Sequence, residues 1–374
     1  MPVDNADAGL ASWIRLTLIP GIGGETRRRL LRTFGLPAAI FGAGLVALRG
    51  VIDPPLAERL LLTDAAIAAE IDATLAWAAE PGNAVVTLAD SAYPQALLTS
   101  ADPPVLLYVK GRVDLLNRPA MAIVGSRNAT PQGIANAEAF AASLSGVGLT
   151  VVSGLALGID AAAHRGALSA TGAHSGSTVA VIGTGADRIY PARNRELARS
   201  IASHGAIVSE FPLNTPALAA NFPRRNRLIA GLAKGCLVVE AAARSGSLIT
   251  ARLAAEAGRD VFAIPGSIHS PLAKGCHQLI KQGAKLVESA QDILEEIGWH
   301  AAVADPDAGL NGPAIDAEGV TLLTLLGPDP CDIDTLAARS GLTPAALLAM
   351  LLELELDGHV ASLPGGRYQR VQRI

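Results

Sequence analysis

Short, continuously apolar segments recur along the middle of the chain and alternate with stretches whose apolar residues follow a helical spacing. Strands buried on both faces of a sheet have this character, because neither face alternates with solvent. The segments predict nine strands: Val85–Leu88, Leu106–Val109, Met121–Val124, Thr150–Val152, Val179–Ile182, Ala206–Val208, Leu237–Val239, Val261–Ile264 and Lys285–Val287. Helical patterns follow most of the later strands, which predicts a mostly parallel, doubly wound α/β sheet.

Before this region, residues 12 to about 80 carry apolar residues at helical spacing, as in Leu60–Trp77. Between the first two predicted helices lies the glycine turn Ile19–Gly24, which leads into Arg27, Arg28 and Arg29. This arrangement resembles a helix-hairpin-helix, whose glycine turn lets backbone N–H groups approach a phosphate. The signature is short, and an ordinary turn between two helices explains it equally well.

The C-terminal part predicts a separate small domain. Residues 301–314 are rich in Ala, Asp, Gly and Pro, as a linker would be. Three helices and a hairpin then predict a winged helix: Val320–Leu326, Ile333–Ser340, Pro344–Leu356, His359–Leu363 and Tyr368–Val371. The helix Pro344–Leu356 has two acidic residues and no basic one, so it lacks donors for DNA. We expect a protein-contact or structural role here, with Arg367 and Arg370 of the wing as weaker DNA candidates.

Length and composition indicate the number of domains and the location of the protein in the cell. Half of the 374 residues are hydrophobic, which suffices for several cores. We expect four segments: a helical module (1–80), an α/β core (81–300), the linker (301–314) and a winged helix (315–374). No signal peptide or uninterrupted bilayer-length apolar run is found, which predicts a cytoplasmic protein. Cys236, Cys276 and Cys331 are too far apart for a zinc or redox motif and are expected to be buried.

The net charge of −4 conceals a basic segment. Between Arg118 and Ala290 there are 17 Lys and Arg against 9 Asp and Glu, a net charge of +8, so the flanks together carry −12. Such asymmetry is what an anionic partner requires, although a solvated basic face would give the same count.

Glycines, small polar residues and arginines follow several predicted strands. These positions are Gly125-Ser126-Arg127-Asn128, Ser153-Gly154, Gly183-Thr184-Gly185, and Glu240 with Ser245-Gly246-Ser247. Glycine permits close backbone approach, helix N-termini offer N–H donors and arginine binds phosphate in a bidentate manner. Because the carboxyl ends of parallel strands meet at one edge, we expect these positions to converge.

The segment Asn221–Leu232 is the strongest local signal for an anion. Phe222-Pro223 begins a helix, and Arg224, Arg225 and Arg227 load its first turns with positive charge. The helix dipole disfavours each cation there by about 0.3–1 kcal/mol, which a bound anion would offset. We expect these arginines and the strand-end residues Arg127 and Arg188 to lie exposed at loops around one phosphate-binding cradle.

Enzymatic alternatives depend on three residues. Asp160 and His164 lie four positions apart and fit either an orienter and base or a helix-start pair in which Asp160 satisfies His164. Glu240 or Asp160 could serve as the acid of a nucleoside-phosphate hydrolase-like enzyme. The chain has no Walker lysine motif, no Gly-x-Ser-x-Gly elbow and no His-Glu-x-x-His, and Gly183-x-Gly185 lacks the third glycine of a dinucleotide site.

Several motifs in unbroken order between about residues 100 and 290 together resemble the DNA-processing protein A (DprA/Smf) family. They are Gly125-Ser126-Arg127, Ser153-Gly154-x-Ala156-x-Gly158-Ile159-Asp160, Tyr190-Pro191-x-x-Asn194, Ser209-Glu210-Phe211-Pro212, Phe222-Pro223-x-Arg225-Asn226-Arg227 and Ser245-Gly246-Ser247-Leu248. The resemblance implies a Rossmann-like core between a SAM-like helical module and a winged helix.

The resemblance also implies a function without catalysis, cofactor or metal. Such a protein dimerises through its core, binds single-stranded DNA by the phosphate backbone and loads a RecA-type recombinase in natural transformation. A pure recombinase adaptor is a further alternative. The candidate DNA-binding residues are Gly125, Ser126, Arg127, Ser153, Gly154, Arg188, Phe222, Arg224, Arg225, Asn226, Arg227, Ser245, Gly246, Ser247 and Lys274.

Overall fold

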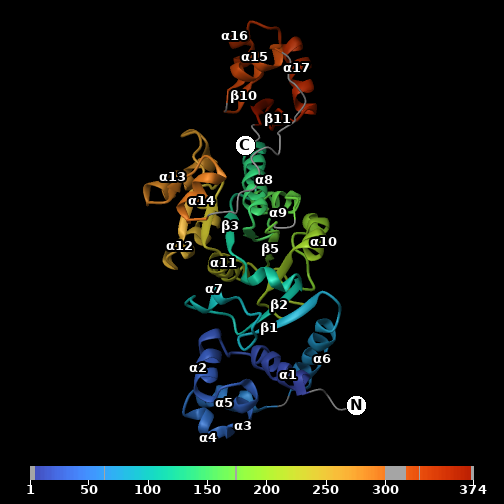
Figure 1. The fold of residues 1–374 in the computed structure, drawn as a ribbon, viewed down its shortest axis with the longest axis vertical. Coiled ribbons are helices and arrows are strands. Elements are labelled where there is room, and N and C mark those ends of the chain that lie inside the picture. Colours follow the sequence, from blue (N-terminus) through green and yellow to red (C-terminus); the bar gives the residue numbers. More distant parts are fainter. Residues whose placement is uncertain (1–4, 63, 173–174, 300–316, 328, 372–374) are drawn as a thin grey trace.

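The computed structural model describes residues 5–62, 64–172, 175–299, 317–327 and 329–371. Within them, an N-terminal helical module (residues 5–78) precedes the first strand (Figure 1). Its helices are α1 Asn5–Leu18, α2 Gly24–Phe34, α3 Pro37–Gly42, α4 Gly44–Arg49, α5 Pro54–Leu61 and α6 Ala65–Ala78. Leu16, Leu30, Leu48 and Leu60 are fully buried between them. The predicted helical character of this region is confirmed.

The glycine turn between α1 and α2 is an ordinary helical turn. Gly21 has φ +83°, which favours glycine where the chain reverses. Arg29 is exposed, but the two arginines before it are directed into the chain: Arg27 donates to two carbonyls of α1 at 3.2 and 2.6 Å, and Arg28 pairs with Asp102. Because these donors are already engaged, the structure favours the ordinary turn over a phosphate-binding helix-hairpin-helix.

One large sheet forms the centre of the molecule. Its strands are β1 Asn83–Thr87, β2 Leu106–Gly111, β3 Ala120–Val124, β4 Thr150–Ser153, β5 Thr178–Val181, β6 Ala206–Ser209, β7 Gly235–Val238, β8 Asp260–Ala263 and β9 Lys285–Leu286. Their order is β1-β2-β6-β5-β4-β3-β7-β8-β9. From β6 to β9 all neighbours are parallel, whereas β2 is antiparallel to β1 and β6. All nine predicted strands are present.

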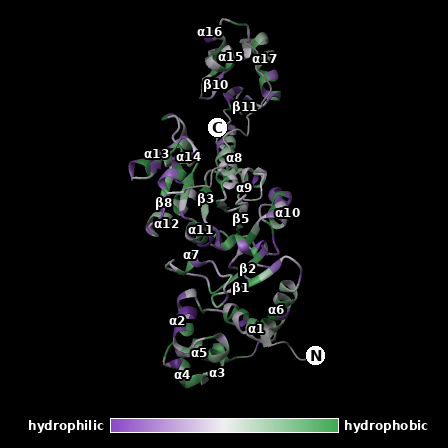
Figure 2. Cartoon of the chain, viewed as in Figure 1, coloured by the Kyte–Doolittle hydropathy of each residue, from purple (hydrophilic) through white to green (hydrophobic). Residues whose placement is uncertain are grey.

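Helices cover both faces of this sheet, as a doubly wound fold requires. They are α7 Gln95–Leu98, α8 Pro131–Gly146, α9 Ile159–Ser169, α10 Arg195–His204, α11 Asn221–Leu232, α12 Ser247–Glu256, α13 Lys274–Lys281 and α14 Ala290–Glu296. Residues of α11, α12 and α13 pack on one face, and residues of α8, α9 and α14 pack on the other. Figure 2 shows the hydrophobic β3 inside these layers, where each of its residues is buried.

The strand order reverses between β3 and β7. The chain passes from β3 outward through β4, β5 and β6 and returns at β7 on the other side of β3. The helices that follow β3 and β7 therefore leave toward opposite faces, since α8 and α12 belong to different core layers. Ligands of doubly wound sheets bind in the crevice that opens at such a point.

The N-terminal helical module packs against the antiparallel edge of the sheet (Figure 1). Trp13 and Ile14 of α1 and Trp77 of α6 are buried together with Leu106 and Tyr108 of β2. The rings of Trp77 and Tyr108 meet edge to face, with their centroids 6.0 Å apart. This apolar contact brings the start of α2 near the loop that precedes β2.

The C-terminal domain has the predicted helices and hairpin. Its elements are α15 Ala317–Leu326, β10 Cys331–Asp332, α16 Ile333–Ser340, α17 Pro344–Leu356, β11 Val360–Leu363 and β12 Arg367–Arg370. The strands pair in the order β10-β12-β11, so one short strand joins the predicted hairpin. Leu348, Leu352 and Leu356 of α17 are exposed, and Glu353 lies among them. The predicted linker, 301–314, lies outside the described residues.

Within the described ranges, no single helix has the length and apolar character to cross a membrane. In the same ranges, α16 and α17, bent by 105° at their junction, pass that test as a pair, by length and composition alone. The three cysteines are buried and form no disulfide in this part of the chain, so their predicted burial is confirmed.

Candidate nucleic-acid interface

The loop after β3 forms one wall of the crevice. The N–H of Ser126 donates to the carbonyl of Glu240 at 2.7 Å, and the carbonyl of Ser126 accepts from the N–H of Ile159 at 3.1 Å. Its hydroxyl accepts from the N–H of Asn128 at 3.1 Å, which closes a tight turn. Arg127 lies at the tip of this turn with an exposed side chain. A guanidinium in this position is accessible to an anion in the crevice.

Gly158, at the start of α9, lies directly against this loop. Its φ is +75°, and a Cβ there would be 2.3 Å from the carbonyl oxygen of Ser126. Any side chain at this position would push the loops after β3 and β4 apart, because the clash is with backbone. The glycine is therefore explained by the close packing of these two loops.

Phe222 and Tyr190 form an aromatic wall beside Arg127. Their ring centroids are 5.8 Å apart, with 41° between the planes. The Arg127 Cζ lies 5.6 Å from the centroid of the Phe222 ring, within the range of a cation–π contact. Tyr190 is 50% exposed. This wall therefore offers a surface on which a base can stack.

Arg225 lies beneath the crevice, with an exposure of 4%. Its Nη1 donates to the carbonyl of Val181 at 3.0 Å, and its Nε has no hydrogen-bond partner among the described residues. Gly154 makes room for it, because a Cβ at Gly154 would be 1.5 Å from Nη1 and 2.6 Å from Oδ2 of Asp160. The expectation that Arg225 is an exposed loop residue is therefore wrong.

Arg225 and Asp160 form a buried pair of opposite charges at the floor of the crevice. Burial raises the pKa of Asp160, and the charge of Arg225 opposes this rise. Burial likewise lowers the pKa of Arg225 to about 10, and Asp160 opposes that change. The two opposite charges therefore offset each other in part at the floor of the crevice. Arg127, for which no ion pair is found within the described residues, supplies exposed positive charge above it.

The loop after β7 forms the opposite wall. Arg244 is exposed there, and the hydroxyls of Ser245 and Ser247 are 2.7 Å apart at the start of α12. Asn226 of α11 donates through Nδ2 to the carbonyl of Gly246 at 3.5 Å. This contact joins α11 to the wall that carries Arg244.

These walls enclose a cleft of about 770 Å³ at the switch point of the sheet. We name it the strand-end cleft. Nine predicted site residues line it: Gly125, Ser126, Arg127, Phe222, Arg225, Asn226, Ser245, Gly246 and Ser247. Within the described chain, no group of three or more His, Cys, Asp or Glu side chains is placed to hold a metal ion.

Six predicted site residues lie outside the cleft lining, and four of them are Ser153, Gly154, Arg188 and Lys274. Ser153 is fully buried, and its hydroxyl donates to the carbonyl of Ile123 at 2.6 Å. Gly154 is behind Arg225. Arg188, in the loop after β5, and Lys274, at the start of α13, are exposed but do not reach the cleft lining.

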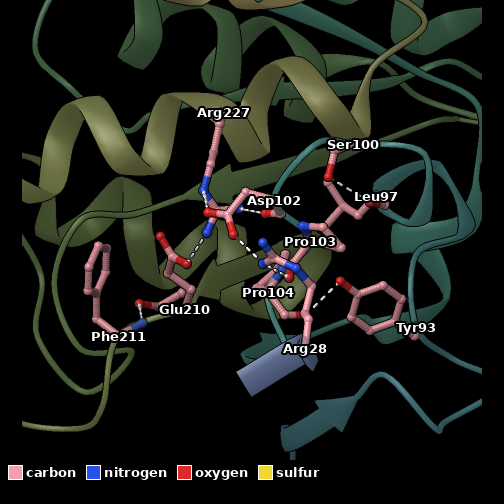
Figure 3. A network of polar contacts seen from close by, with 11 residues as sticks. Arg28, Tyr93, Leu97, Ser100, Asp102, Pro103, Pro104, Glu210, Phe211 and Arg227 are labelled. Atoms are coloured by element: carbon pink, nitrogen blue, oxygen red, sulfur yellow. Dashed lines mark hydrogen bonds and ion pairs between the residues drawn. The ribbon is translucent and has the colours of Figure 1, made fainter. Parts of the chain in front are cut away.

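Arg224 and Arg227 lie on the side of α11 away from the cleft. The Arg224 Cζ lies 5.2 Å from the centroid of the Phe211 ring. Arg227 bonds the carboxylate of Glu210 and approaches Asp102 (Figure 3). The expected cluster of three arginines around one cradle is therefore divided: Arg225 faces the cleft, and the other two face Glu210.

His164, the candidate base of the enzymatic alternative, is held by buried hydrogen bonds. The Nδ1 of His164 lies 2.7 Å from the hydroxyl of Thr178, which itself donates to the carbonyl of Val151 at 2.7 Å. The imidazole is therefore the donor, and Asp160 is not its partner, contrary to the helix-start expectation. Burial lowers the pKa of His164 to about 3. A neutral ring sealed in this way is no accessible base.

Glu240 holds the loop that leads into α8. Its two carboxylate oxygens accept from the hydroxyl of Thr130 at 2.6 Å and from the N–H of Thr130 at 2.9 Å. Burial raises its pKa, and these bonds oppose the rise. Glu240 does not line the cleft, so its geometry fits a loop support rather than a catalytic acid.

Among the further lining residues, Asn128, Asp160, Tyr190 and Arg244 carry polar or charged groups and are absent from the predicted set of DNA-binding residues. Asn128 and Asp160 belong to motifs named in the sequence analysis, and Arg244 directly precedes Ser245, so extending the predicted site along each motif finds all three. Tyr190 lies in a loop that returns to the cleft after an excursion from β5, and strand-end spacing gives no signal for such a return.

Two family models match the chain: one described as DNA recombination-mediator protein A over residues 84–298, and one described as DprA winged helix domain over residues 304–366. Protein Smf of Escherichia coli (strain K12) is 43% identical over 311 residues, which are 81% of this chain and 81% of Smf.

Two solved structures have a similar fold. The X-ray structure of DNA processing protein A from Streptococcus pneumoniae gives a TM-score of 0.64 at 39% identity, covering 77% of this chain and 97% of that chain. DNA processing protein A from Helicobacter pylori, whose structure is described as giving insight into a unique single-stranded DNA binding mode, gives 0.51 at 30% identity. It covers 57% of this chain and 95% of that chain.

Fold and cleft together define a Rossmann-like α/β protein with a cleft at the switch point of its sheet and a C-terminal winged helix. The family models and the similar proteins then show to which family of this class the chain belongs. The chain belongs to the DNA recombination-mediator protein A family, which confirms the resemblance seen in the sequence and assigns the protein to DNA processing.

Proposed function

We propose that the protein binds single-stranded DNA in the strand-end cleft, mainly through the phosphate backbone, and passes that strand to a RecA-type recombinase. The observation that carries the proposal is Arg127. Its guanidinium lies exposed at the switch point of the sheet, beside the aromatic pair Phe222 and Tyr190. Positive charge and stackable rings are features that a single strand needs.

Charge distribution supports a polyanionic ligand. Residues 118–290 carry a net charge of +8 in a chain of net charge −4, so the basic residues are concentrated in the segment that forms the cleft. Arg127 and Arg244 lie on opposite walls and can contact successive phosphates. We expect affinity to fall steeply with salt, as it does when counterions are released from the strand.

The aromatic content of the cleft limits base recognition. Phe222 and Tyr190 are its two aromatic lining residues. A long series of stacked bases therefore has no platform here, and sequence preference is expected to be weak. This favours a protein that accepts any single strand, which is the property that a recombination mediator requires.

The proposal also includes the binding partners of the protein, its location in the cell and its oligomeric state. Transfer of the strand to a recombinase, a role in natural transformation, a cytoplasmic location and a homodimer formed through the core are what family membership supports. The winged helix is assigned to protein contact or structure, because α17 presents leucines and Glu353 to solvent and no basic residue.

The direct test compares oligonucleotide binding by wild type, Arg127→Ala and Arg199→Ala, measured by fluorescence anisotropy with single strands and duplexes. Arg199 is the matched control, because it is an exposed arginine, 63% accessible, on α10 and outside the cleft lining. We expect Arg127→Ala to lose about tenfold or more in affinity, as for a charge-assisted hydrogen bond, and the control to keep wild-type affinity. Equal affinities of the two variants would refute the cleft assignment.

We propose no catalytic activity for this site. Asp160 is the acid that lines the cleft, and Arg225 compensates its charge. Incubation with nucleoside monophosphates tests this directly. Turnover that Asp160→Asn abolishes would establish a nucleotide-processing enzyme instead.

A further inference from the structure

Arg227 is held on the far side of α11 by two acidic residues (Figure 3). Its Nη2 bonds the carboxylate of Glu210, just after β6, and its Nε lies 3.2 Å from Oδ2 of Asp102. Its Nη1 donates to the backbone carbonyl of Asp102 at 2.6 Å. All three guanidinium nitrogens are thus engaged inside the chain, and the side chain is only 20% exposed. This geometry fits an anchor rather than a phosphate ligand.

Asp102 extends the same contacts to the N-terminal helical module. It lies in the loop between α7 and β2, and its Oδ1 bonds Nη1 of Arg28 in α2 (Figure 3). The same Nη1 donates to the carbonyl of Pro103 at 3.2 Å. A continuous set of ion pairs therefore joins α2 to α11. We call these four residues, Arg28, Asp102, Arg227 and Glu210, the anchor network.

Glu210 makes the anchor costly to release. Its side chain is 7% exposed, and its Oε1 has no hydrogen-bond partner in the described part of the chain. Burial raises its pKa, while the charges of Arg227 and Arg224 oppose that rise. A carboxylate buried in this way needs its counter-charge. Arg227 therefore cannot turn toward a DNA strand without leaving Glu210 unpaired.

α11 transmits the position of this anchor to the cleft. It is a single helix, Asn221–Leu232, with Phe222, Arg225 and Asn226 on the cleft side and Arg227 on the opposite side. A helix of this length moves as one body, so a shift at Arg227 displaces the lining residues. Binding groups must be held within about half an ångström by the residues behind them.

We propose that Arg227 is a positioning residue of the DNA site and that the N-terminal helical module supports DNA binding through the anchor network, without touching the strand. This inference rests on the proposed function, because it needs a strand in the strand-end cleft. The helical module would thus contribute to DNA binding indirectly, although its glycine turn is not a phosphate-binding site.

Asp102→Asn is the most discriminating substitution, because its two effects have opposite signs. Removing a carboxylate makes the net charge more positive by one unit, so long-range attraction alone would tighten binding of oligothymidylate. Loss of the anchor displaces α11 instead. We expect affinity to fall by about 3- to 30-fold, as for residues that act on a site through its support. The slope of affinity against salt should equal that of the wild type, since no phosphate contact is lost.

Glu58→Gln is the matched control, since it removes a carboxylate from an exposed ion pair with Arg49 in the same module. Its affinity should stay within about twofold of the wild type. Wild-type or tighter binding by Asp102→Asn would overturn the proposal. So would a lower melting temperature with unchanged affinity, which is the mark of a purely structural contact.

Two further variants separate the remaining possibilities. Arg227→Met should weaken binding with an unchanged salt slope, whereas a slope reduced by about 0.7 would show that Arg227 contacts a phosphate and is not a positioning residue. If that variant does not fold, Asp102→Asn decides alone. If Arg127→Ala also binds normally, the cleft itself is not the DNA site, and the failure is that of the proposed function.

Discussion

Arg225→Met tests the buried charge pair below the cleft. Methionine keeps much of the apolar stem of arginine but removes the charge and the bond from Nη1 to the carbonyl of Val181. Asp160 then remains buried without the guanidinium that compensates it. We expect this change to destabilise the core, although Arg225 belongs to a run of arginines that looks like a surface cluster in the sequence.

The expected loss is about 1–3 kcal/mol near pH 8, the range for leaving a buried polar or charged group without a partner. Asp160 can relieve part of the loss by taking up a proton. Its folded-state pKa is already raised by burial, and it rises further without Arg225. The folded variant then binds more protons than the unfolded chain, so its stability falls as pH rises. The deficit should thus be smaller at pH 5.5 than at pH 8.

Native-state hydrogen exchange of the amides in β4 and β5 is the suitable assay, because a chain with several modules does not unfold in one step. Asp160→Asn combined with Arg225→Met should recover much of the lost protection, since no buried charge remains unpaired. A loss below about 1 kcal/mol, or a deficit that does not change between the two pH values, would show that the two charges are not coupled.

Two other substitutions have defined outcomes. Glu240→Gln should destabilise the core by about 1–3 kcal/mol, because an amide has one accepting oxygen where the carboxylate receives both bonds from Thr130. Amide hydrogen exchange in β3 and β7 that matches the wild type would contradict this. His164→Leu should remove part of the pH dependence of the free energy of unfolding. Since burial lowers the folded-state pKa of His164 to about 3, the unfolded chain binds more protons below about pH 6.5. Wild-type stability therefore falls toward acid by up to about 1.4 kcal/mol per pH unit from this group, and an equal slope in the variant would rule this out.

The fold could be predicted from the sequence because its signals are local. Apolar segments such as Met121–Val124 and Val179–Ile182 coincide with β3 and β5 to within a residue at each end. The convergence of the loops after β3 and β7 follows from parallel strands meeting at one edge, a rule of topology that needs no coordinates.

The split of the arginine run could not be predicted in the same way. A helix directs residues 225 and 227 to different sides, but the sequence does not say what covers each side. Arg225 is buried because Gly154 opens space below the cleft, and Arg227 because the loop around Asp102 and the start of α2 close over it. Both causes are contacts between segments far apart in the chain.

The central claim is that exposed arginines on the two walls of the strand-end cleft contact DNA phosphates. The most direct measurement is the slope of log affinity against log salt for oligothymidylate, compared between the wild type and Arg127→Ala combined with Arg244→Ala. Two lost phosphate contacts predict a slope that is shallower by about 1.4. Equal slopes would show that the strand binds elsewhere on the protein.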